Sequence, residues 1–86
     1  MLKEEVWRTK DGQIVRYSLA YINPEICPVD NGRVLGYDNS HDHHHRHFMG
    51  GQESIRFTGY EAMAARFYDE VRGLWRKEDE TRYKIR

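Results

Sequence analysis

A stripe of apolar residues near the C-terminal end constrains the fold more than any other feature of this sequence. Between residues 60 and 75 the apolar side chains recur at steps of three and four, which places them along one side of an α-helix. Thr58 followed by Glu61 is typical of a capping box, so we expect the helix to begin there. The stripe consists of Tyr60, Met63, Ala64, Phe67, Val71, Leu74 and Trp75. A helix with one apolar side needs a second apolar surface to cover.

The N-terminal part of the chain predicts that surface as a β-sheet. Strands are expected at 3–9, 13–23, 33–39 and 54–57, while 41–48 fits either a further strand or an irregular loop. In the segment 13–23, Tyr17, Leu19 and Tyr21 have one parity, as in a strand with one buried face. Lys10-Asp11-Gly12 is a turn signal that would pair the first two strands as a hairpin.

The predicted fold class is therefore α+β: a small antiparallel β-sheet of three to five strands, with one C-terminal amphipathic helix packed on one face. We expect a single domain over residues 1–86, in which the charged segment 77–86 could be a flexible tail. Trp7 and Trp75 are expected to anchor the core, and Cys27 to be a small buried hydrophobic residue. A domain of this size buries little surface, so a homodimer would stabilise it.

Composition and charge exclude several classes of protein. No run of about 18 apolar residues exists, so we expect no membrane-spanning helix. Fourteen Lys and Arg residues balance fourteen Asp and Glu residues, which disfavours a purely electrostatic nucleic-acid binder. The single cysteine excludes an internal disulfide framework, and we expect no secretory signal, because no basic segment followed by an apolar run opens the sequence. These features predict a cytoplasmic protein.

The most unusual segment holds all five histidines of the protein, within residues 41–47. If this segment is an extended strand, its odd-numbered side chains point to one face of the sheet and its even-numbered side chains point to the opposite face. The first set is His41, His43, His45 and His47, and the second is His44 and Arg46. Imidazoles packed together repel one another when protonated, so their pKa values should be lowered.

Three interpretations of this segment remain open from the residues alone. It could be a solvated polar loop without chemistry. It could bind Zn²⁺ or Ni²⁺ through its imidazoles, with Asp38 or Asp42 as an oxygen ligand, although any such metal could be adventitious. The third interpretation is acid–base chemistry on RNA, which needs no cofactor.

RNA cleavage needs a base to remove the 2′-OH proton and an acid to protonate the leaving oxygen. His45 and His47 could supply both, in an order that the sequence does not assign. Arg46 or Arg33 could stabilise charge on the phosphate, and Asp38 could orient one imidazole ring. On this interpretation the chain is a metal-independent endoribonuclease.

Two adjoining motifs resemble those of a known family. The stretch Arg33-Val34-Leu35-Gly36-Tyr37-Asp38-Asn39, followed by His44-His45-Arg46-His47, is similar to the TumE-type toxins of toxin–antitoxin modules, and the order of elements agrees from 13 to 75. The resemblance implies a growth-arresting toxin that is neutralised by an antitoxin, usually one with a helix-turn-helix domain. Ribonuclease activity is an extrapolation from other small toxins.

Carried over position by position, Asp38, Asn39, His45 and His47 match the family motif, and His44 and Arg46 match it less closely. These six residues are the candidate catalytic residues. Two alternatives to a ribonuclease remain: a non-catalytic domain that binds a metal or a partner, and a toxin that acts on a target other than RNA.

Overall fold

The computed structural model describes the backbone of residues 1–85 and the side chains of residues 1–81. Its elements are β1 (Leu2–Arg8), β2 (Ile14–Ile22), β3 (Arg33–Asp38), β4 (His45–Phe48), β5 (Gly51–Ser54) and α1 (Tyr60–Ile85). Two short 3₁₀ turns, η1 (Asp30–Gly32) and η2 (Ser40–Asp42), precede β3 and β4.

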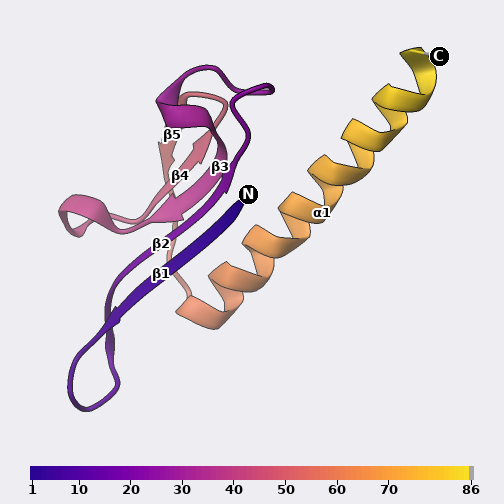
Figure 1. Ribbon diagram of the computed structural model, residues 1–86. Helices are drawn as coiled ribbons and strands as arrows, with labels where there is room; N and C mark the ends of the chain where they lie inside the picture. Colours follow the sequence, from indigo (N-terminus) through magenta and orange to yellow (C-terminus); the bar gives the residue numbers. More distant parts are fainter. Residues whose placement is uncertain (86) are drawn as a thin grey trace.

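Within this part of the chain the strands form one five-stranded sheet in the order β1-β2-β3-β4-β5, and each strand runs antiparallel to the next. Helix α1 crosses one face of the sheet and continues beyond it (Figure 1). No α-helix of the described residues covers the opposite face of the sheet, and we call it the open face. The predicted α+β class, with an antiparallel sheet and one C-terminal helix, is confirmed.

The core lies between α1 and the sheet. Met63, Phe67 and Val71 are buried at the predicted spacing, and they pack against the buried parity of β2 and β3. The fully enclosed cluster contains Tyr17, Leu19, Tyr21, Cys27, Val34, Leu35, Tyr37, Met63, Phe67 and Val71. Burial of Cys27 agrees with the sequence interpretation. Because Tyr17 and Leu19 face the helix, the alternate residues Arg16 and Ser18 face the open side.

The last strand is not where the sequence predicted it. A strand was expected at 54–57, but β5 covers Gly51–Ser54. Met49 and Gly50 both have positive φ, 49° and 87°, and they form a tight turn directly after β4. This turn starts the pairing of β5 with β4 at Gly51, opposite Phe48. Met49 and Gly50 are therefore the two central residues of the hairpin turn between β4 and β5.

The two ends of the helix also differ from expectation. The amide of Met63 donates to the carbonyl of Gly59 at 3.1 Å, so Gly59 rather than Thr58 occupies the cap position. Near the other end, Trp75 is 43% exposed, and its ring is T-shaped to that of Tyr21 with centroids 6.1 Å apart. Trp7 is 46% exposed, so the expectation that both tryptophans anchor the core was wrong. The helix continues to Ile85, through most of the charged segment 77–86, and residue 86 lies outside the described residues. Flexibility of this segment stays a prediction.

Candidate functional site

Four polar side chains meet on the open face at the junction of β3 and β4. The register pairs Asp38 with His45, and Gly36 with His47, so both histidines share a face with the carboxylate. Arg33, at the start of β3, reaches the same carboxylate. We call Arg33, Asp38, His45 and His47 the Asp38 cluster. The parity predicted for an extended histidine segment therefore holds in β4, which begins at His45.

Asp38 lies between the two imidazoles. Its Oδ2 is 2.9 Å from His47 Nε2, and its Oδ1 is 3.7 Å from His45 Nδ1. Asp38 and His47 are only 7% and 8% exposed. His47 Nε2 is buried and lies at ion-pair distance from the Asp38 carboxylate. It makes no hydrogen bond, because the geometry between the ring nitrogen and the carboxylate is not aligned for one. A proton on this nitrogen would complete an ion pair with Asp38.

Arg33 supplies the cation of the cluster, and Gly36 makes room for it. Arg33 Nη1 lies 3.4 Å from Asp38 Oδ2, while its Nε donates to Asp30 at 2.9 Å. The arginine side chain passes directly over Gly36, where a Cβ atom would lie 2.6 Å from Arg33 Cδ. Glycine inside a strand often marks such a close approach, but the sequence does not say which side chain passes over it.

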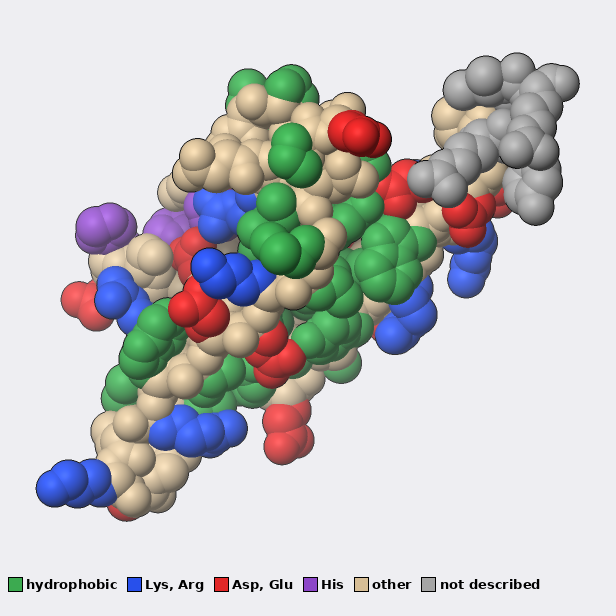
Figure 2. All heavy atoms as spheres, in the orientation of Figure 1, with side chains coloured by type: hydrophobic (Ala, Val, Ile, Leu, Met, Phe, Trp, Pro, Cys, Tyr) green, Lys and Arg blue, Asp and Glu red, His purple; other side chains and the backbone are tan. Residues whose placement is uncertain are grey.

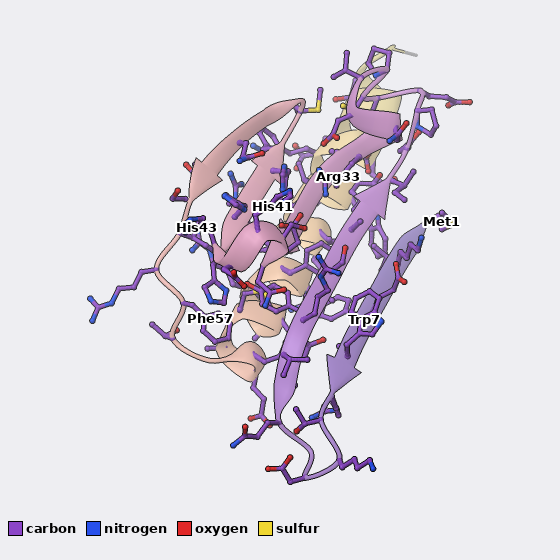
Figure 3. All side chains as sticks on the ribbon, turned by 90° about the vertical axis from the view of Figure 1, so that its left-hand side faces the viewer. Met1, Trp7, Arg33, His41, His43 and Phe57 are labelled. Carbon is purple, nitrogen blue, oxygen red and sulfur yellow. The ribbon has the colours of Figure 1, made fainter. Side chains whose placement is uncertain are left out.

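The turn η2 brings two further imidazoles to the edge of the cluster. His41 and Asp42 have left-handed φ values of 58° and 61°, and the turn leads the chain back into β4. Figure 3 looks onto the open face, with α1 behind the sheet, and shows His41 and His43 on the viewer's side. His43 is exposed, and its ring centroid lies 6.2 Å from that of His45. The structure thus places near the site residues that the family resemblance did not assign.

His44 lies on the opposite side of the chain from His45. It shares a 2.6 Å hydrogen bond with the Tyr17 hydroxyl through Nδ1, and its ring stacks on Phe57 with centroids 4.0 Å apart. Burial, followed by the neighbouring His45 and His43, lowers the pKa of His44. The direction of this pKa shift is the one expected from the sequence, but the main cause is burial of the ring, and the neighbouring imidazoles add to it. His44 contacts the packed side of the sheet and not the Asp38 cluster.

Arg46 also lies on the helix side, where it binds Glu70 of α1. Its Nε donates to Glu70 Oε2 at 3.1 Å, and the Tyr37 hydroxyl donates to the other oxygen of the same carboxylate. Burial raises the pKa of Tyr37 to about 12, and the hydrogen bond to Glu70 adds to this effect. Arg46 thus connects β4 to the helix, while Arg33 occupies the position beside Asp38.

Asn39 has a backbone role in this structure. Its Oδ1 accepts the amide of Tyr17 at 3.0 Å, and its Nδ2 donates to the carbonyl of Val15 at 3.0 Å. Beyond the end of β3, the Asn39 side chain therefore makes the hydrogen bonds to the β2 backbone that a neighbouring strand would otherwise make. This holds the end of β3, and with it Asp38, in register with β2.

One groove of about 760 Å³ lies away from the Asp38 cluster, between the end of the sheet and the second half of α1. Phe48, Met49 and Trp75 are among its lining residues. Figure 2 shows hydrophobic side chains gathered between sheet and helix, with the histidines at the left-hand margin. The described residues contain no group of three or more His, Cys, Asp or Glu side chains arranged to hold a metal ion. Across these residues, no helix combines the length and apolar character that a membrane span requires.

Comparison with known proteins gives one match. The family model described as toxin TumE matches residues 2–75. The match includes all five strands, the Asp38 cluster and the part of α1 that covers the sheet. No curated protein and no solved structure matches the chain.

Proposed function

We propose that this chain, which belongs to the TumE toxin family and is the toxin component of a toxin–antitoxin module, acts on RNA as a small ribonuclease. The observation that carries the proposal is the Asp38 carboxylate between two imidazoles, with the Arg33 guanidinium beside it, on a sheet face that no helix covers. Acid–base groups and a cation in one place are what phosphodiester cleavage requires.

The proposed reaction uses the two histidines in sequence. One imidazole removes the proton of the RNA 2′-OH, and O2′ forms a bond to phosphorus. The bond from phosphorus to the 5′-oxygen breaks, and the second, protonated imidazole donates its proton to that oxygen. The products are a 2′,3′-cyclic phosphate and a free 5′-OH. We assign these roles to His45 and His47, whose ring centroids lie 6.1 Å apart, and leave their order unassigned.

The other residues of the cluster have supporting roles in the proposal. Asp38 orients a histidine ring and balances the charge of the imidazolium. The sequence offered the stabilisation of negative charge on the phosphate to Arg46 or Arg33. We propose Arg33 for it, because Arg33 lies beside Asp38 while Arg46 binds Glu70 on the helix side. His44 and Asn39, also candidates, would act through packing and strand register rather than by touching RNA.

The partner of a toxin of this kind is an antitoxin. We propose that the antitoxin carries a helix-turn-helix domain and is encoded beside this protein. The test is direct: co-expression with the neighbouring gene should abolish growth arrest and yield a complex on size-exclusion chromatography. Growth arrest that persists with that gene present would contradict this assignment.

The ribonuclease proposal is tested with purified protein and cellular RNA in EDTA. We expect cleavage between about pH 5 and pH 8, with a bell-shaped rate profile, because one histidine must be neutral and the other protonated. EDTA should not reduce the rate, since no metal takes part. Intact RNA across this range, with a protein that circular dichroism shows to be folded, would reject the proposal in favour of a toxin with another target.

The role of Arg33 can be isolated at Gly36. In a Gly36→Ala variant the new methyl group would occupy the path of the Arg33 side chain, so the guanidinium should leave Asp38. We expect cleavage to fall by about tenfold or more, in keeping with the loss of one charge-stabilising group. Gly73→Ala is the matched control, because a Cβ atom there meets nothing within 4 Å. A rate for Gly36→Ala equal to that of the control would show that the position of Arg33 does not matter.

A further inference from the structure

An exposed tryptophan lies on the same open face as the Asp38 cluster. Val6 of β1 packs against the core, so the next residue, Trp7, points to the opposite side of the strand. Trp7 is 46% exposed although it is one of the largest apolar side chains in the protein. Figure 3 shows Trp7 on β1, on the viewer's side of the sheet, as is Arg33. Nothing in the packing of the core requires an indole at this position.

Trp7 is paired across the strands with an exposed arginine. The register of β1 and β2 places Arg16 directly opposite Trp7. Among the described residues Arg16 takes part in no ion pair, whereas Arg33 binds Asp30 and Asp38, and Lys3 lies 3.3 Å from Glu5 on the same face. Arg16 is therefore a cation of the open face whose charge no neighbouring carboxylate neutralises.

We propose that Trp7 and Arg16 form a nucleotide-binding subsite for single-stranded RNA. A base stacks on the exposed face of the Trp7 indole, and the Arg16 guanidinium binds the adjacent phosphate. An aromatic ring beside an unpaired guanidinium offers both the apolar plane and the positive charge that an unstacked nucleotide needs. The inference rests on the proposed function, because it supplies binding for the RNA that the Asp38 cluster would cleave.

The spacing of the sheet connects this subsite with the cluster. Ser18, two residues beyond Arg16 on β2, is paired with Asp38 on β3. Trp7 is thus two strands and two residues away from Asp38, about 12 Å at ordinary sheet spacing. A short oligonucleotide laid across the strands would span this distance, with one base on Trp7 and a distal phosphate at Arg33. A single nucleotide would not reach both places.

The experiment measures RNA affinity separately from cleavage. Binding of a fluorescently labelled, mixed-sequence RNA hexamer is followed by anisotropy, with the His45→Ala/His47→Ala double variant as background so that the RNA stays intact. We expect Trp7→Ala to weaken binding by about tenfold and Trp7→Phe to restore most of it. Arg16→Ala should weaken binding. It should also reduce the slope of log affinity against log salt concentration by about one, because one fewer counterion is released on binding. Trp75→Ala, a half-exposed tryptophan on α1, is the matched control and should bind like the background protein.

The outcomes separate this inference from the proposed function. Equal affinities for Trp7→Ala and Trp75→Ala would overturn the subsite, even if the wild-type protein cleaves RNA. Weaker binding by Trp7→Ala, in a protein whose wild type does not cleave RNA, would leave the subsite standing and reject the catalysis. Sedimentation gives the remaining outcome: if Trp7→Ala dissociates a dimer without changing RNA affinity, Trp7 contacts a second copy of the chain and the inference is wrong.

Discussion

Replacing His47 by alanine is expected to lower the rate of RNA cleavage by about 10²- to 10⁴-fold, the usual contribution of a general acid or base. His45→Ala should have an effect of similar size. Because the two imidazoles act in one reaction, the double variant should lose little more than either single variant. Initial rates on a fluorogenic RNA substrate in EDTA provide the measurement, and the pH profile of each single variant should lose one limb of the bell.

The control for these variants is His44→Gln. His44 is adjacent to His45 in the sequence but faces the opposite side, where it bonds to Tyr17. Glutamine can keep a hydrogen bond to that hydroxyl, so we expect a folded protein with nearly full activity. Equal losses in His44→Gln and His47→Ala would mean that the histidines support the fold of the strand, and the assignment of His47 to catalysis would fail.

The largest effect on stability is expected for Glu70→Ala. The Glu70 carboxylate accepts hydrogen bonds from Arg46 and Tyr37 and lies 3.4 Å from Arg66 Nε. Its removal leaves the buried Tyr37 hydroxyl without its acceptor and the Arg46 guanidinium with only Glu53, 3.5 Å away, and should lower the free energy of unfolding by about 2 to 3 kcal/mol. Urea denaturation measures this quantity. Asp69→Ala is the matched control, because its ion pair with Arg72 is exposed and should contribute less than about 1 kcal/mol.

The same carboxylate gives the protein a specific response to acid. Burial raises the pKa of Glu70, but the hydrogen bonds from Arg46 and Tyr37 outweigh this effect and hold the pKa below its ordinary value of 4.5. A lowered carboxyl pKa stabilises the folded state above the unfolded value, and the contribution is lost as the pH falls through the folded value. Glu70→Gln should therefore flatten the decline in stability below about pH 4.5. An unchanged decline would assign the acid response to other carboxylates.

Much of this arrangement could be predicted from the sequence, because alternation and helical spacing are local. The stripe that contains Met63, Phe67 and Val71 predicted the buried side of α1. The alternation in β4 predicted that His45 and His47 lie on one face and Arg46 on the other. These patterns depend only on the geometry of a strand and a helix.

The pairing between strands could not be predicted in the same way. Whether Asp38 lies opposite His45 depends on how many residues the turn between β3 and β4 takes up, and η2 uses two residues with positive φ to do so. No glycine marks that turn. The choice between Arg33 and Arg46 likewise needed the side-chain path over Gly36 and the contact with Glu70, which lies 24 residues from Arg46 along the chain. Trp7 was wrongly predicted to lie in the core because of its size. Its position in the alternation of β1 puts it on the open face instead.

The central claim is that the Asp38 cluster cleaves RNA through the 2′-OH. The most direct measurement incubates the wild-type protein with a defined RNA oligonucleotide in EDTA and identifies the fragments by mass spectrometry. A second oligonucleotide carries a 2′-deoxy substitution at the main cleavage position. We predict fragments that end in a 2′,3′-cyclic phosphate and begin with a 5′-OH, and no cleavage at the substituted position. Cleavage that persists at the 2′-deoxy position, or an intact oligonucleotide with folded protein, would contradict the claim.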